Sequence, residues 1–127
     1  MRDIQNAYGK IFEYEGVCDF STSEKCFEFS NGTITNYYEY ENNNENNEAC
    51  PRDVVIPRTI NDVVVTKIGS KSFKEKELTS VEFPDSIIEI QNEAFSNNKI
   101  SGKLELSHCT NLKIVQGFNN NQITSVE

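Results

Sequence analysis

Apolar residues recur at a fixed interval in the second half of this chain, and that interval constrains the fold more than any other feature. Three columns share a spacing of 22 or 23 residues: Phe73, Phe95 and Phe118; Leu78, Ile100 and Ile123; Val81, Leu104 and Val126. A single unit of this size cannot bury its own apolar side, so successive units must stack on one another. The interval therefore predicts a short solenoid of roughly three coils, each 22–23 residues long.

A period of about 20–29 residues is typical of leucine-rich repeats, in which each coil contains a strand and a return segment. The strand reads Val54-Val55-Ile56-Pro57 in one coil and Val81-Glu82-Phe83-Pro84 in the next. Side chains alternate along a strand, so the first and third residues point inward and the second points outward. The expected core of the array consists of Ile68, Phe73, Leu78, Val81, Ile90, Phe95, Ile100, Leu104, Phe118, Ile123 and Val126.

The outward strand positions form a column on one face of the predicted sheet. Its members are Val55, Glu82, Glu105 and Glu127. Neighbouring strands lie about 4.8 Å apart, so carboxylates in one column repel one another. The glutamates either extend into water, with Lys103 nearby to compensate, or form a shallow acidic stripe that binds a basic partner or a host surface. This column is the candidate binding site.

The charge is unevenly distributed along the chain. Residues 1–50 hold 3 Lys and Arg against 10 Asp and Glu, a net charge of −7, whereas residues 51–127 hold 9 against 10, a net charge of −1. Such asymmetry indicates two regions with different roles. We expect an N-terminal cap over residues 1–50 and a leucine-rich repeat array over residues 51–127.

Three elements are expected within the cap. Apolar residues at a helical period predict an amphipathic helix over 3–15, which either covers the end of the core or contacts a partner or filament. Asn31-Gly32 predicts a tight turn in a β-hairpin over about 26–40. A polar loop follows over 41–48. The expected fold class is α/β, a short solenoid capped by one helix and a hairpin.

Composition excludes several classes of function. The net charge of −8 argues against nucleic acid and anionic lipid as partners. No segment approaches the ~20 apolar residues of a membrane span, and residues 1–6 lack the apolar region of a signal peptide. His108 and Cys109 are adjacent, and adjacent side chains seldom act together as base and nucleophile. We therefore expect no catalytic residues, no metal site and no cofactor.

The repeats resemble those of the BspA-like leucine-rich repeat family over about residues 53–127. Three segments carry the resemblance, Val54–Gly69, Leu78–Ile87 and Ile90–Asn98, and their Ile-Gly, Pro-Asp-Ser-Ile and Ala-Phe elements recur in register. The resemblance implies a secreted or surface-exposed protein that acts in adhesion or protein–protein recognition and has no conserved chemistry. Residues 2–18 more faintly resemble the end of a pilin-type N-terminal helix. That resemblance implies an alternative function, a structural subunit of a surface filament.

In a secreted protein, a disulfide is expected within the cap among Cys18, Cys26 and Cys50, whose pairing the sequence leaves open. Cys109 occupies a position that is usually a buried apolar turn in the family, so a free, packed thiol is expected there. The final residues read as part of another strand. An uncovered edge strand pairs readily with another chain, so self-association is expected through this strand or through the N-terminal helix.

Overall fold

The computed structural model describes residues 20–38 and 50–127. The predicted helix over 3–15 and the predicted loop over 41–48 lie outside these residues. The described elements, in chain order, are η1 (Glu24–Cys26), β1 (Phe27–Ser30), β2 (Thr33–Tyr37), β3 (Asp53–Val55), β4 (Thr59–Ile60), β5 (Val63–Val64), β6 (Lys67–Ile68), β7 (Ser80–Glu82), β8 (Glu89–Ile90), β9 (Ser101–Leu104), β10 (Ile114–Val115) and β11 (Gln122–Val126). Strands and one 3₁₀ turn make up this part of the chain, so the helical half of the α/β prediction is not seen in it.

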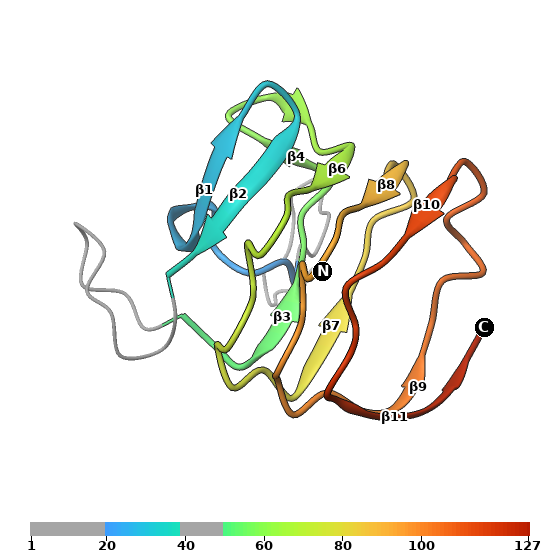
Figure 1. Ribbon diagram of the computed structural model, residues 1–127. Helices are drawn as coiled ribbons and strands as arrows, with labels where there is room; N and C mark the ends of the chain where they lie inside the picture. The colour runs from blue at the N-terminus through green and yellow to red at the C-terminus, as the bar shows by residue number, and fades with distance from the viewer. Residues whose placement is uncertain (1–19, 39–49) are drawn as a thin grey trace, which may run out of the picture.

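Most strands lie in two rows on opposite sides of the molecule, while β4 and β5 form a separate antiparallel pair (Figure 1). One row is a five-stranded sheet in the order β1-β2-β6-β8-β10, parallel from β2 onward. The other row contains the parallel pairs β3–β7 and β9–β11. The chain passes through both rows in each repeat, from β3 to β6, from β7 to β8 and from β9 to β10. The repeats therefore stack as coils, as the 22–23-residue interval requires.

The hairpin of β1 and β2 supplies the first two strands of the five-stranded sheet. Asn31 and Gly32 have φ values of +50° and +84°, the left-handed conformations that a type I′ turn needs at both central positions. Beyond this turn, Ile34 of β2 lies beside Ile68 of β6. Strand pairing thus crosses residue 50, and the division of the chain at that point remains a proposal.

Aromatic rings stack through the middle of the coils. Ring centroids are 5.1 Å apart for Tyr37 and Phe73, 4.7 Å for Phe73 and Phe95, and 5.0 Å for Phe95 and Phe118. Phe73, Phe95 and Phe118 come from successive repeats, so the 22–23-residue interval places them in one column, which Tyr37 of the hairpin extends. Stacking of this kind contributes roughly 0.5–1.5 kcal/mol per pair beyond the burial of apolar area.

Burial of the predicted core decreases toward the last coil. The residues that the structure buries are Ile68, Phe73, Leu78, Val81, Ile90, Phe95, Ile100 and Leu104. Phe118 and Ile123 are half-buried and pack against this cluster. Val126 is 61% exposed, so its assignment to the core is wrong. It has the apolar character of its column, but no described coil lies over it.

Two asparagines join successive coils. The buried Asn98 donates from Nδ2 to the carbonyls of Phe73 and Phe95, both at 2.8 Å, and its Oδ1 accepts from the backbone N–H of Leu78 at 3.0 Å. Asn121 repeats the arrangement 23 residues later, with Nδ2 2.9 Å from the Phe95 carbonyl. Sequence reasoning missed both residues, although their spacing matches that of the apolar columns.

Candidate recognition surfaces

The predicted binding column lies on the outer side of the row that contains β3, β7, β9 and β11, here called the sheet face. Strand register places Val55 beside Glu82. The Glu127 N–H donates to the Leu104 carbonyl at 2.9 Å, which places Glu127 along the strand that carries Glu105. The three glutamates are exposed and Val55 is half-buried. The structure therefore brings the members of the column together in two neighbouring pairs.

A single cation partly neutralises one end of the column. Lys103 Nζ lies 3.6 Å from Glu105 Oε2 and 3.1 Å from Glu127 Oε1. The hydroxyl and backbone N–H of Ser107 also donate to Glu105, and these hydrogen bonds, aided by Lys103, lower the pKa of its carboxyl. No ion pair to Glu82 is found in the described residues, so Glu82 is the carboxylate of the column most open to an external cation.

The sheet face is interrupted between β7 and β9. The described residues contain no strand pairing there, although Lys99 N–H still donates to the Leu78 carbonyl at 2.8 Å. Gly102, with φ +78°, is the extra residue of this coil, and we attribute the break to it. The His108 ring lies across the break, with Nε2 2.6 Å from the Phe83 carbonyl oxygen. The predicted binding column is therefore divided into two short segments, one with Val55 and Glu82 and one with Glu105 and Glu127. The His108 side chain bridges the gap between them.

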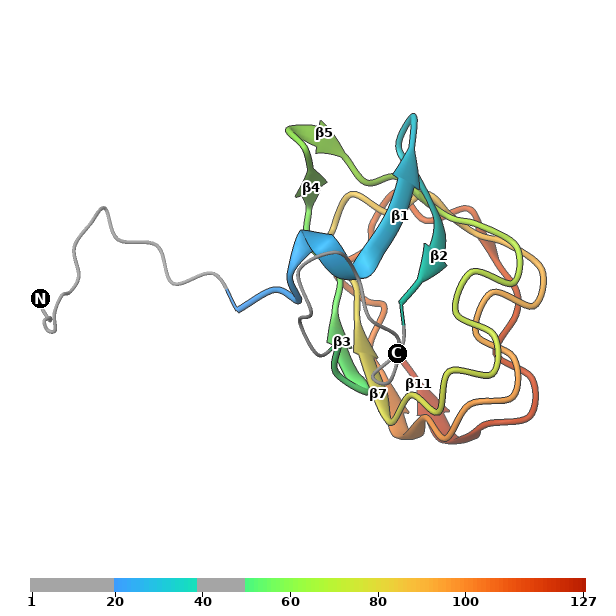
Figure 2. The same cartoon turned by 90° about the vertical axis from the view of Figure 1, so that its left-hand side faces the viewer.

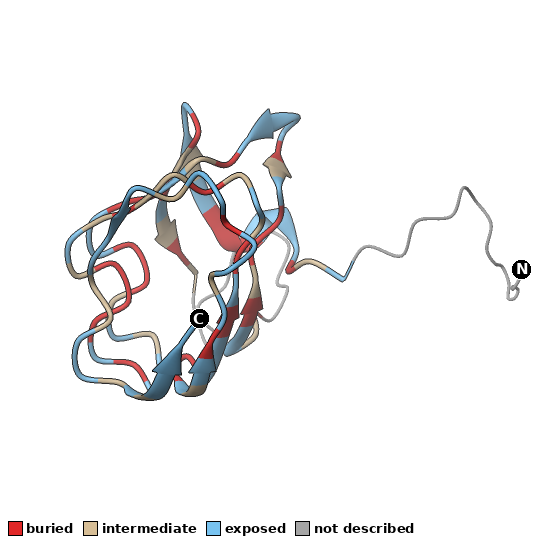
Figure 3. Cartoon of the chain, turned by 90° about the vertical axis from the view of Figure 1, so that its right-hand side faces the viewer, coloured by how far each residue is buried: buried red, intermediate tan, exposed pale blue. Residues whose placement is uncertain are grey.

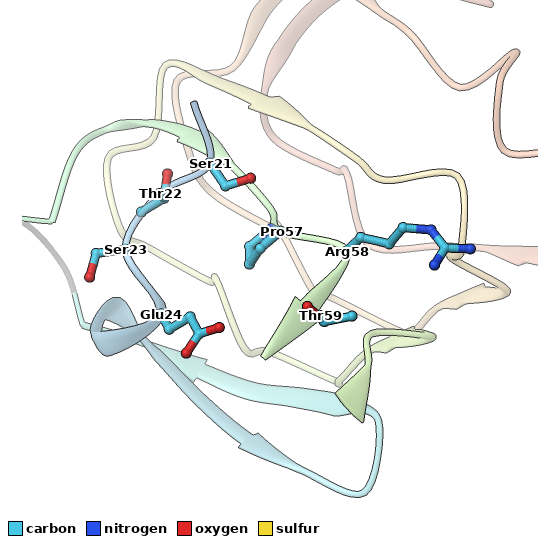
Figure 4. Close-up of a pocket in the computed structure, with 7 residues that line it drawn as sticks. All are labelled: Ser21, Thr22, Ser23, Glu24, Pro57, Arg58 and Thr59. Carbon is cyan, nitrogen blue, oxygen red and sulfur yellow. The ribbon is translucent and has the colours of Figure 1, made fainter. Parts of the chain in front are cut away.

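A second surface feature, which the sequence did not predict, is a hollow of about 310 Å³ beside β3 (Figure 4). Its lining residues are Ser21, Thr22, Ser23, Glu24, Pro57, Arg58 and Thr59. One lining residue, Thr22, is held against β3, since its N–H donates to the Val55 carbonyl at 2.8 Å and its hydroxyl accepts from the Val55 N–H at 2.9 Å. Arg58 pairs with Asp85 at 3.0 Å. Hydroxyls of this kind can hydrogen-bond a polar group, but they do not form a catalytic constellation.

The three cysteines among the described residues stabilise the fold or pack within it. Cys26 and Cys50 form a disulfide, which is one of the pairings that the sequence left open, while Cys18 lies outside the described residues. Cys109 is a free, buried thiol whose pKa is raised chiefly by burial. Its Sγ lies 3.5 Å from the Pro84 carbonyl, whereas the neighbouring His108 ring contacts Phe83. The two side chains are therefore held by separate backbone partners. Across the described ranges, His, Cys, Asp and Glu form no cluster suited to a metal ion.

One family model matches the chain, and its description is BspA type leucine rich repeat region (6 copies). The matches span residues 17–100 and 47–127. The chain belongs to this family. The match begins well before residue 53, so it includes the hairpin that supplies the first two strands of the five-stranded sheet. No curated protein and no solved structure matches. No helix in the described part of the chain is both long and apolar enough to span a membrane.

Proposed function

We propose that this protein is a non-enzymatic module that recognises a protein partner, as in adhesion, and that the sheet face is its binding surface. Membership of the BspA-type family supports the proposal, since stacked repeats present extended surfaces suited to protein partners. Three strands of the sheet face rest on the buried core through Val54 of β3, Val81 of β7 and Leu104 of β9. Side chains on rigid elements lose little conformational freedom when a partner binds.

The observation that carries the proposal is the charge of the sheet face. Its exposed charged residues are Asp53, Glu82, Lys103, Glu105 and Glu127, four carboxylates against one ammonium group. A partner with Lys or Arg side chains would gain attraction chiefly at Glu82, since Lys103 partly neutralises Glu105 and Glu127. Complementary charge of this kind accelerates association and selects against acidic partners. We therefore favour a basic protein surface as the partner.

We also propose that the protein is secreted or exposed at a cell surface. The Cys26–Cys50 disulfide supports this location, because disulfides persist in oxidising compartments and are rare in the cytosol. The alternative function as a filament subunit rests on residues 2–18, which lie outside the described residues. No contact in the described part of the chain favours it.

The binding surface can be tested with a displayed library of random peptides. Peptides selected on the wild-type protein should be rich in Lys and Arg. The double variant Glu82→Lys with Glu105→Lys should bind them about 10- to 100-fold more weakly at low salt, because two attractive contacts become repulsive. The measurement is the dissociation constant of each selected peptide by biolayer interferometry.

The matched control is the double variant Glu28→Lys with Asp62→Lys. It changes the net charge equally, and both residues are exposed, Glu28 in β1 and Asp62 in the turn between β4 and β5, away from the sheet face (Figure 2). Equal losses in the two double variants would mean that only the overall charge matters. Selection of peptides without basic residues, or unchanged binding by the sheet-face variant, would remove the sheet face as the site.

A further inference from the structure

The break in the sheet face is bridged by the one histidine of the chain. Its ring is held across the gap, since Nε2 of His108 lies 2.6 Å from the carbonyl oxygen of Phe83. A carbonyl oxygen only accepts, so Nε2 carries the proton of this hydrogen bond. The ring is then either neutral, with Nδ1 as an acceptor, or cationic, with a second proton on Nδ1. Both forms keep the Nε2–H group, so the ring keeps its place and only its charge changes.

The ring lies between the two segments of the predicted binding column. Phe83, which accepts its hydrogen bond, directly follows Glu82 of β7. Ser107, which directly precedes His108, donates to Glu105. His108 is exposed, as are most residues of β9 and β11 on the same side of the molecule (Figure 3). A charge on the ring therefore acts on the same surface as the carboxylates of the column.

The histidine joins two segments, 80–86 and 101–109, whose other ionisable residues are Glu82, Asp85, Lys103, Glu105 and Cys109. Asp85 is paired with Arg58 at 3.0 Å. Glu105 is partly neutralised by Lys103 at 3.6 Å. Glu82 has no ion pair among the described residues, so it is the carboxylate whose attraction for an external cation a positive ring would reduce most.

The groups around the ring keep their charge over the pH range in which histidine titrates. Hydrogen bonds from Ser107, aided by Lys103, lower the pKa of the Glu105 carboxyl, so this group is ionised throughout that range. Burial raises the pKa of the Cys109 thiol, so the thiol is uncharged there. Carboxyl groups ordinarily ionise near pH 4, whereas histidine ordinarily changes charge between about pH 5 and 8. A change in the charge of this surface within that range is therefore due to the histidine.

We infer that His108 is a further residue of the binding surface, and that the sheet face binds a basic partner more weakly when this ring is protonated. The inference rests on the proposed function, and the partner is the same Lys- or Arg-bearing protein surface. A neutral ring leaves four carboxylates against one ammonium group on the sheet face, and a protonated ring adds a second cation. One added unit charge near a partner's cation in water weakens binding by roughly threefold or more.

The test uses Lys- and Arg-rich peptides that contain no histidine and have blocked ends. Peptides selected on the wild type at about pH 7.5 are kept only if the sheet-face double variant weakens their binding more than its control does. The dissociation constant for the wild type should rise about three- to tenfold between about pH 7.5 and 5.5. His108→Gln keeps a donor for the Phe83 carbonyl but takes up no proton, so its dissociation constant should change less than about twofold. His108→Lys is cationic throughout and should bind weakly at both pH values.

Proton NMR of the wild type provides a measurement that needs no variant. Because the chain contains one histidine, the resonance of its ring Cε1 proton is identified directly. Binding and protonation are linked reciprocally, so a partner that prefers the neutral ring displaces its proton. Saturating peptide at about pH 6.5 should therefore shift this resonance toward its position at high pH. No shift, or a shift toward the low-pH position, would overturn the inference.

The outcomes separate the inference from the function on which it rests. Wild-type affinity that does not depend on pH would overturn the inference and leave the sheet face as the binding surface. The same pH dependence in His108→Gln would do so too, because another group would then carry it. If no selected peptide responds to the sheet-face double variant, the proposed function fails first and the inference fails with it.

Discussion

The middle coil and the last coil of this protein carry similar residues at equivalent positions but differ in burial. Phe95 and Phe118 belong to one column, yet Phe95 is fully buried and Phe118 is half-buried. Leu104 and Val126 lie side by side in β9 and β11, yet only Leu104 is buried. The comparison shows that a repeat obtains its burial from the coils on either side of it. Energetics in such stacks are therefore dominated by contacts between neighbours.

The largest expected contrast is in the ring column. Phe95→Ala should lower the free energy of unfolding by about 3–5 kcal/mol, because it opens a cavity between two stacked rings. Phe118→Ala should lower it by less than about half as much, since one side of that ring has no described neighbour. Urea denaturation at low protein concentration measures both. Equal losses would show that the last coil is as tightly packed as the middle one.

The next largest effect concerns the N-terminal end, where the disulfide provides a cover that the last coil lacks. Replacing Cys26 and Cys50 together by Ala should lower the free energy of unfolding by about 3 kcal/mol, because the cross-link restricts the unfolded chain. Hydrogen exchange should accelerate more in β1, β2 and β3 than in β9 and β11. Cys109→Ala serves as the control for loss of a thiol. Uniform acceleration along the chain would mean that the cross-link does not act as a local cap.

A smaller contrast separates the two bridging asparagines. Asn98→Ala should lower the free energy of unfolding by about 2 kcal/mol, because it leaves buried backbone groups of both flanking coils without partners. Asn121→Ala should have a smaller effect, since water can reach the groups it leaves unpaired in the half-buried last coil. Urea denaturation of the two variants measures the difference. A larger loss for Asn121 would reverse the comparison between the coils.

These contrasts also explain which features of the fold and of the candidate site could be predicted from the sequence. The 22–23-residue interval identifies the stacked coils, and Asn31-Gly32 identifies the hairpin turn. The interval gives Val126 the same position as Leu104 but cannot show whether another coil covers it. The hollow beside β3 was missed because residues 21–24 follow no repeat, and their path depends on backbone pairing with Val55. The burial of a side chain and the shape of a pocket depend on contacts between segments that are distant in sequence. Periodicity gives only the position of a residue within its own repeat.

The smallest predicted effect tests the exposed end of the apolar column. Val126→Ala, measured at a low protein concentration, should change the free energy of unfolding by no more than about 0.5 kcal/mol, because exposed positions contribute little. Leu104→Ala, at the adjacent buried position in β9, should cost about 2–5 kcal/mol. A substantial loss for Val126→Ala at low concentration would mean that part of the same chain covers this side chain. If the loss instead emerges only as concentration rises, the cover comes from a second copy, because an effect that depends on concentration requires a contact between chains.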